Sequence, residues 1–95
     1  MTKNDILNEL EKVEHPAINY SLIKLGIVSD VELNNNTVSV VFAFPFPNIP
    51  IADMLINSIA QQLIALGLKF DYKTRLMNDE EKEHFLKLET EAWKG

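Results

Sequence analysis

The sequence predicts a single α+β domain, in which a small mixed sheet of three strands packs with an N-terminal helix, a long central helix and a C-terminal helix. Two observations lead to this prediction. The hydrophobic patterns run along the chain in the order helix, strand, strand, helix, strand, helix, which is typical of mixed α+β domains. With 95 residues, 46% hydrophobic and 24% charged, the chain is expected to form one domain over residues 1–95.

The first expected helix runs from about Asn4 to Val13. Thr2 and Asp5 have the spacing of a capping box, and the residue before Pro16 avoids helical geometry, so the helix should end there. Apolar residues recur at helical spacing, and they are Ile6, Leu7, Leu10 and Val13. A short helical turn over residues 21–24, closed by Gly26, is expected to lead into the sheet.

A β-hairpin is predicted over residues 27–44. Residues 27–33 alternate between apolar and polar, which indicates a half-buried strand with Ile27, Val31 and Leu33 on one side. The Asn-rich turn over residues 34–36 suits positive φ angles. The returning strand has apolar residues on both faces and is therefore expected to be central. Its main apolar face consists of Val38, Val40, Phe42 and Phe44.

A proline-rich segment follows this strand and opens the central helix. Prolines 45, 47 and 50 remove backbone donors and prevent strand pairing, so residues 45–50 are expected to form a stiff, extended loop. We call this segment the proline loop. The helix is predicted from about Ile51 to Leu66, and Gly67 ends it.

The last predicted elements are a strand over residues 68–75 and a C-terminal helix capped by Asn78. The strand should present Leu68, Phe70 and Tyr72 inward, and its connection through the central helix allows it to lie parallel to the second strand. The acidic first turn of the helix suits its dipole. Phe85, Leu88 and Ala92 are expected to lie along one face of the helix. Trp93 is expected to close the core, with anchoring of a partner as the alternative.

Composition restricts the functions that these residues can perform. Residues 1–95 contain no cysteine, so they supply no disulfide, no thiolate nucleophile and no thiolate ligand for a metal cluster. The formal charge of −5 argues against nucleic acid as a partner. No apolar stretch is long enough to cross a membrane, and the N-terminus lacks a signal-peptide pattern. We therefore expect a cytoplasmic protein.

The sequence contains no convincing catalytic site. His15 and His84 are the only histidines, and both are expected on the surface. Glu80 and Glu81 lie in the first turn of a helix, where capping explains them better than acid–base chemistry does. We predict that the chain is not an enzyme and has no catalytic residue, bound metal or cofactor.

Aromatic residues around the proline loop offer a binding surface instead. Phe42 and Phe44 are expected in the core, whereas Phe46 lies between two prolines and is either a core residue or an exposed anchor for a partner.

The order of short motifs resembles the iron–sulfur cluster assembly domain of SufT and PaaD proteins, and of the N-terminal domain of Mrp/ApbC-type carriers. The resemblance covers about residues 4–75. The first helix ends in Val-Glu-His-Pro (13–16), and Leu-Gly-Ile-Val (25–28) enters a strand. An Asn-rich hairpin turn follows, and Pro-Asn-Ile-Pro (47–50) then opens a long apolar helix.

The chain departs from the family pattern at its most reactive position, which makes it a degenerate member of the family. The family commonly has Asp-Pro-Glu where this chain has His15-Pro16-Ala17, and Pro-Gly-Cys-Pro where this chain has residues 47–50. Ile49 therefore occupies the cysteine position, and Pro45 aligns with a family threonine. Isoleucine cannot ligate iron, so the resemblance implies the fold without direct cluster ligation by this chain.

The resemblance implies a non-catalytic accessory or adaptor domain related to iron–sulfur cluster assembly, acting through protein–protein contacts. An accessory subunit of a multicomponent oxygenase, as in the PaaD context, and a self-associating structural module are the alternatives. The expected partners are iron–sulfur assembly factors, apoproteins or, in a homodimer, a second copy of the chain. The candidate binding surface consists of Pro45, Phe46, Pro47, Asn48, Ile49, Pro50 and His15.

Overall fold

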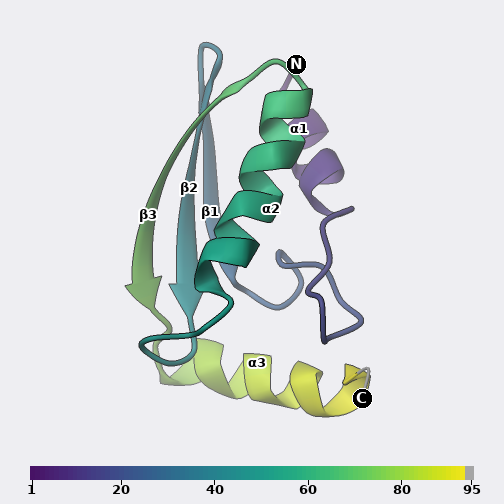
Figure 1. The fold of residues 1–95 in the computed structure, drawn as a ribbon, viewed down its shortest axis with the longest axis vertical. Helices are drawn as coiled ribbons and strands as arrows, with labels where there is room; N and C mark the ends of the chain where they lie inside the picture. Colours follow the sequence, from purple (N-terminus) through teal and green to yellow (C-terminus); the bar gives the residue numbers. More distant parts are fainter. Residues whose placement is uncertain (94–95) are drawn as a thin grey trace.

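The computed structural model describes residues 1–93 and confirms the predicted α+β fold (Figure 1). Within these residues, three strands form one sheet in the order β1-β2-β3, so β2 is central as expected. Strand β1 is antiparallel to β2, and β3 is parallel to β2. The elements are α1 (Lys3–Leu10), β1 (Val28–Asn34), β2 (Thr37–Phe44), α2 (Ala52–Ala65), β3 (Lys69–Leu76) and α3 (Asp79–Ala92).

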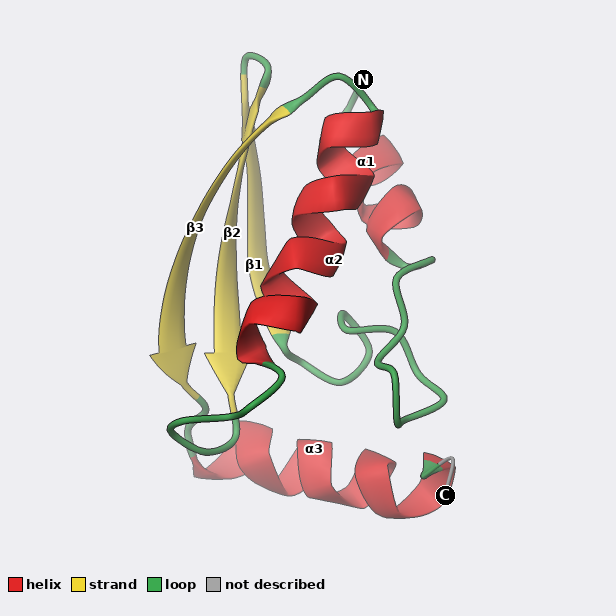
Figure 2. Cartoon of the chain, viewed as in Figure 1, coloured by secondary structure: helices red, strands yellow, loops and turns green. Residues whose placement is uncertain are grey.

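Two of the helices form a layer beside the sheet, and the third lies at one end of the molecule. Helices α1 and α2 lie on the same face of the sheet, and α3 runs across the end toward which β2 and β3 point (Figure 2). The proline loop joins β2 to α2 at this same end, close to α3 (Figure 1). No helix within residues 1–93 has the length and apolar character needed to cross a membrane.

The core lies between the sheet and the helices, and it includes buried residues of α1, α2, α3 and the segment before β1. Phe42 is fully buried, and its ring lies 6.3 Å from the ring of Phe44 and 5.9 Å from that of Tyr72. Burial of a side chain of this size contributes about 1.5–3 kcal/mol to folding. The apolar stripe of α2 covers β2, and its buried residues are Leu55, Ile59 and Leu63.

Helix α1 ends earlier than predicted, at Leu10 instead of Val13. The predicted capping box is present, since Thr2 and Asp5 exchange hydrogen bonds at the N-terminus. At the other end, the chain turns so that the carbonyl of Val13 accepts a hydrogen bond from the amide of Leu22. The amides of Lys12 and Val13 each bond to the carbonyl three residues back, so the α-helical pattern stops before Val13.

Strand β1 contains an irregularity that the alternation pattern did not predict. The register with β2 shifts between Val28 and Asp30, which places Val28 and Val31 on the same buried face. The hydroxyl of Ser29 donates a hydrogen bond to the carbonyl of Val41, 3.1 Å away. Such a bulge bends an edge strand and interrupts its pairing surface.

Two aromatic residues are more exposed than predicted. Tyr72 faces the helix layer as expected, but 47% of its surface is accessible because β3 is an edge strand. Trp93 is 55% exposed, so the expectation that it closes the core is wrong. Trp93 follows the last turn of α3 and pairs through its backbone with Ile18. His84 is exposed, as predicted.

Candidate functional site

Burial decreases along the chain from the end of β2 into the proline loop. Phe44 and Pro45 are buried, residues 46–48 are exposed, and Ile49 is partly buried against the core. Each proline fixes its own φ near −65°. The loop therefore presents a short exposed segment on a backbone that has little conformational freedom.

Asn48 occupies a backbone conformation that few residues adopt. Its φ is +57°, in the left-handed region, where glycine is favoured and asparagine is one of the tolerated alternatives. The resembled family has glycine at this position. The replacement of glycine by asparagine is thus compatible with the same turn of the backbone, even though the next residue, Ile49, is not a cysteine.

Phe46 is the exposed aromatic residue of the loop. Its surface is 45% accessible, and the ammonium group of Lys82 lies 4.6 Å from the ring centroid. A cation–π contact at an exposed site contributes about 0.5–1 kcal/mol. The choice left open by the sequence is therefore resolved: Phe46 lies outside the core, while Phe42 and Phe44 lie within it as predicted.

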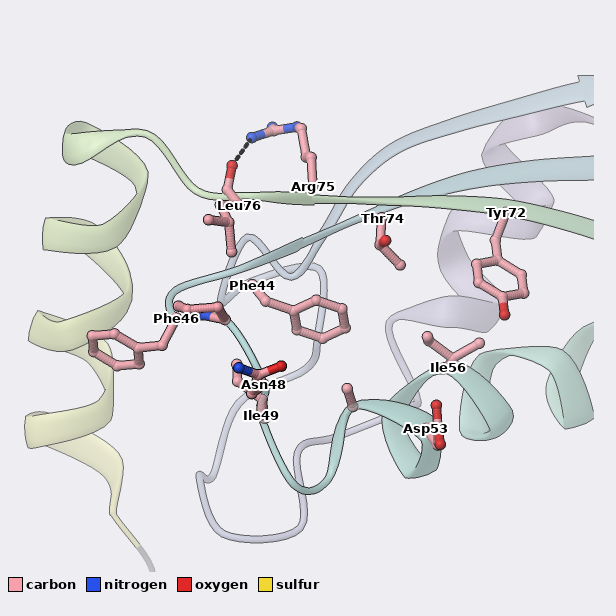
Figure 3. A pocket seen from close by; sticks show the side chains of 12 residues that line it. Phe44, Phe46, Asn48, Ile49, Asp53, Ile56, Tyr72, Thr74, Arg75 and Leu76 are labelled. Carbon is pink, nitrogen blue, oxygen red and sulfur yellow. Dashed lines mark hydrogen bonds between the residues drawn. The ribbon is translucent and has the colours of Figure 1, made fainter.

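A hollow lies on one side of the proline loop, between the first turns of α2 and the end of β3. Its volume is about 430 Å³. In the close-up view, Ile56 and Asp53 of α2 face Tyr72 and Thr74 of β3 across it, and the ring of Phe46 points toward α3 (Figure 3). We call this space the β3 hollow.

A second hollow lies between the loop, α3 and the turn after α1. It also measures about 430 Å³, and its lining is mainly apolar. His15, Phe46 and Ile49 all line it, so the structure brings the distant His15 beside the loop, as the family resemblance implied. Trp93, the residue after α3, completes one wall. We call this space the His15 hollow.

His15 is only 7% exposed, which corrects the prediction that it lies on the surface. Its Nδ1 atom accepts a hydrogen bond from the amide of Ala17 at 3.0 Å, and its own amide donates to the carbonyl of Tyr20. These bonds fold the 15–20 segment around the ring. The proline that follows His15 suggested a surface turn, but the chain after it turns inward: Ile18 is fully buried and pairs through its backbone with Trp93, the residue after α3.

Strand β3 and helix α3 also contribute to the site, although no local sequence pattern indicated it. Tyr72 and Leu76 line the β3 hollow, whereas Phe85 and Glu89 line the His15 hollow. These residues are distant from the proline loop in the chain. Their patterns indicated a strand and a helix correctly, but contained no signal that both elements meet the loop.

An ion pair holds α3 against the end of β3. The guanidinium nitrogens of Arg75 donate to both carboxylate oxygens of Glu81, each over 2.7 Å. Glu81 also completes the capping box of Asn78. The Arg75 contact, followed by the Asn78 amide, lowers the pKa of Glu81 to about 2, and the same ion pair raises the pKa of Arg75. This pairing fixes the α3 wall beside the loop.

The start of α2 differs in chemistry from a thiolate site. Ile51 is the N-cap residue and makes no side-chain hydrogen bond to the helix. Asn48 provides the one polar side chain of the proline loop. Among residues 1–93, no group of three His, Cys, Asp or Glu side chains is placed to hold a metal ion. The arrangement of loop and hollows suits contact with apolar groups of another molecule.

Comparison with solved structures supports the fold. A domain of unknown function from Bacillus anthracis superimposes with a TM-score of 0.72 and 18% identity, covering 90% of each chain. A conserved hypothetical protein from Thermotoga maritima gives a TM-score of 0.65 and 21% identity, covering 85% of each chain. At these identities the likeness is one of fold alone.

Comparison of sequences identifies the family. Among curated proteins, no significant match was found. Residues 3–71 match the family model described as iron–sulfur cluster assembly protein. This match includes the proline loop with its Ile49 and ends within β3. The chain therefore belongs to the iron–sulfur cluster assembly protein family, and it is a member without cysteine in residues 1–95.

Proposed function

We propose that this protein is a non-catalytic adaptor in iron–sulfur cluster assembly that acts by protein–protein contacts through the proline loop. The observation that carries the proposal is the exposed Phe46 on a loop stiffened by prolines and flanked by two hollows. Family membership supplies the pathway, and the local chemistry of the loop supplies the mode of action.

The loop is suited to binding because little order has to be created when a partner arrives. Association is weakened by the entropy lost when side chains and loops become fixed. The prolines already restrict the backbone, and Phe46 is held beside Lys82. Aromatic residues with few rotatable bonds are frequent energetic centres of interfaces. A partner's apolar side chains would enter the hollows on either side of Phe46.

An iron–sulfur cluster would be cargo of the assembly and not a resident group of this chain. Thiolates are the usual ligands of such clusters, and residues 1–95 contain none. In this proposal, partner proteins supply the cluster ligands. The chain contributes recognition and relative placement of those partners, with Ile49 forming apolar contact where the family cysteine would lie.

The proposal is tested by affinity capture of the tagged protein from its host without oxygen, followed by quantitative mass spectrometry. Wild type is compared with Phe46→Ala and Ile49→Asp. Ile64→Asp is the matched control, because Ile64 is an exposed residue of α2 that does not line either hollow. Circular dichroism and urea unfolding establish that each variant is folded.

We expect cluster scaffolds, carriers or iron–sulfur apoproteins with the wild type and with Ile64→Asp, and at least a fivefold loss with both loop variants. Unchanged capture by folded loop variants would show that another surface is used. Capture of a multicomponent oxygenase in place of assembly proteins would replace the proposed pathway with the accessory-subunit alternative.

A further inference from the structure

The outer edge of β3 has backbone groups that pair with no other strand within residues 1–93. Strand β3 lies at one edge of the sheet. At one end of its pairing with β2, the amide of Lys69 donates to the carbonyl of Asn36 over 2.7 Å. At the other end, the amide of Met77 donates to the carbonyl of Phe44 over 2.8 Å. In a parallel ladder, alternate residues bond to the same neighbour. The register therefore directs the backbone N–H and C=O groups of Phe70, Tyr72 and Thr74 away from β2.

The side chains of these same alternate residues face the helix layer but are incompletely covered. The rings of Phe70 and Tyr72 stack with centroids 5.4 Å apart, and Tyr72 is half exposed. Farther along, Leu76 is 55% exposed. Tyr72, Thr74 and Leu76 line the β3 hollow (Figure 3). An added strand would therefore find space for apolar side chains on this face.

The opposite face of β3 is basic, in a chain of net charge −5. Its outward residues are Lys69, Asp71, Lys73 and Arg75. Arg75 is paired with Glu81, whereas Lys69 and Lys73 have no ion-pair partner among residues 1–93. An incoming strand with acidic side chains on this face would pair with those two cations.

The two edge strands of the sheet, β1 and β3, differ in how well each could pair with an added strand. Strand β1 is interrupted by the bulge at Ser29, and its Glu32 is paired with Lys3. Strand β3 is continuous over eight residues and contains no proline. Bulges are one device by which proteins block pairing at a sheet edge. The regular edge is therefore β3.

We propose that the free edge of β3 binds an extended segment of a partner protein as a fourth strand. The segment would alternate apolar side chains, directed into the β3 hollow, with acidic side chains beside Lys69 and Lys73. A second copy of β3 offers less charge complementarity than an acidic segment, because it would add three cations, Lys69, Lys73 and Arg75, against one carboxylate, Asp71. The inference goes beyond the proposed function, since strand pairing at this edge does not depend on the iron–sulfur pathway.

The test uses the full chain labelled with ¹⁵N and three blocked octapeptides. One alternates valine with glutamate, one alternates valine with lysine, and one has four valines followed by four glutamates. Amide hydrogen exchange and chemical shifts are followed by NMR. We expect the acidic alternating peptide to protect the Tyr72 and Thr74 amides at least tenfold, with at least fivefold weaker binding of the lysine peptide and of the block peptide.

Variants separate backbone pairing from nonspecific attraction. Thr74→Pro removes an edge amide without removing a donor to β2, whereas Thr74→Val retains that amide. We expect binding to be lost in the first and retained in the second. Lys69→Glu combined with Lys73→Glu should reverse the preference in favour of the lysine peptide. A peptide N-methylated at the amides facing β3 should fail to bind the unaltered protein, which provides the same test if Thr74→Pro does not fold.

Absence of edge protection with both alternating peptides would overturn the proposal, as would undiminished binding by folded Thr74→Pro or by the N-methylated peptide. Concentration-dependent protection of the Tyr72 and Thr74 amides without peptide would identify a second copy as the occupant and overturn the assignment to a partner. Failure of this proposal can be told apart from failure of the proposed function, because every variant here leaves Phe46 and Ile49 unaltered, although both residues also line the β3 hollow.

Discussion

Two connections leave the same end of the sheet, one from β2 into α2 and the other from β3 into α3, and they are built differently. The β3–α3 connection consists of Met77, which is buried, and Asn78, which caps α3. Arg75 and Glu81 fasten it further. The proline loop is longer, and the helix that follows it has no side-chain cap. The short connection is stabilised by hydrogen bonds, whereas the long one is stiffened by prolines and leaves Phe46 exposed.

This difference indicates a division of roles between the two connections. Hydrogen bonds and the ion pair hold α3 in place beside the loop. The proline loop makes fewer bonds of its own and can present its surface to another molecule. If this account is right, substitutions in the β3–α3 connection should mainly affect stability, while substitutions at the exposed part of the proline loop should mainly affect binding.

The largest expected effect separates the buried end of β2 from the exposed part of the proline loop. Phe44→Ala should lower the free energy of unfolding by about 3–5 kcal/mol, because it creates a cavity between the two hollows. Phe46→Ala should lower it by less than about 1 kcal/mol, since it removes chiefly an exposed cation–π contact. Urea unfolding measures both values, and equal losses would contradict the separation.

A smaller effect is expected at the left-handed residue of the loop. Asn48→Val should destabilise the protein by about 1–2 kcal/mol, because a β-branched residue is strained at a φ of +57°. Asn48→Gly is the control and should remain within about 0.5 kcal/mol of the wild type. Both are measured by urea unfolding. If valine and glycine behave alike, the loop does not require the conformation described above.

In the β3–α3 connection, Asn78→Ala should lower the free energy of unfolding by about 1 kcal/mol, because the amide of Glu81 loses its side-chain acceptor. Asn78→Ser retains a capping oxygen and should recover most of that loss. Thermal and urea unfolding provide the measurement. Capture of partners through the proline loop should be the same for both variants, and a selective loss of capture with Asn78→Ala would argue against separate roles.

The subtlest expected effect is on the pH dependence of stability. The pKa of Glu81 is about 2 in the folded protein, below its ordinary value of 4.5, so its contribution is present above about pH 4.5 and is lost as the pH falls toward 2. Glu81→Gln should flatten this part of the profile, whereas Glu80→Gln, an exposed neighbour, should retain it. Urea unfolding between pH 2 and 6 makes the comparison, and parallel profiles would contradict the role of the ion pair.

Local sequence patterns correctly predicted those elements whose structure depends on a single apolar face or on a single capping residue. The alternation in β2, the apolar stripe of α2 and the Asn78 cap all led to the observed elements. The early end of α1 depends on how the turn after Leu10 meets the segment at Leu22, and the bulge at Ser29 depends on pairing with β2. Such contacts leave little mark on local periodicity.

The candidate site was predicted only in part, because contacts between separate segments decide which of its residues are exposed. The proline loop and its proximity to His15 were expected, the second because of the family resemblance. The burial of His15 and the exposure of Tyr72 and Trp93 depend on which neighbouring segments cover them. A tyrosine in an alternating strand is half exposed when no further strand or helix covers the edge, and its own spacing cannot indicate this.

The central claim is that the proline loop contacts proteins of the iron–sulfur assembly pathway. The most direct test replaces Phe46 with a photo-crosslinking benzoyl derivative of phenylalanine, in cells of the host grown without oxygen, with the same derivative at Ile64 as the control. We predict crosslinks from position 46 to a cluster scaffold, carrier or iron–sulfur apoprotein, and none of these from position 64. Crosslinks to such proteins from position 64 alone, or none from position 46 in the folded protein, would contradict the account.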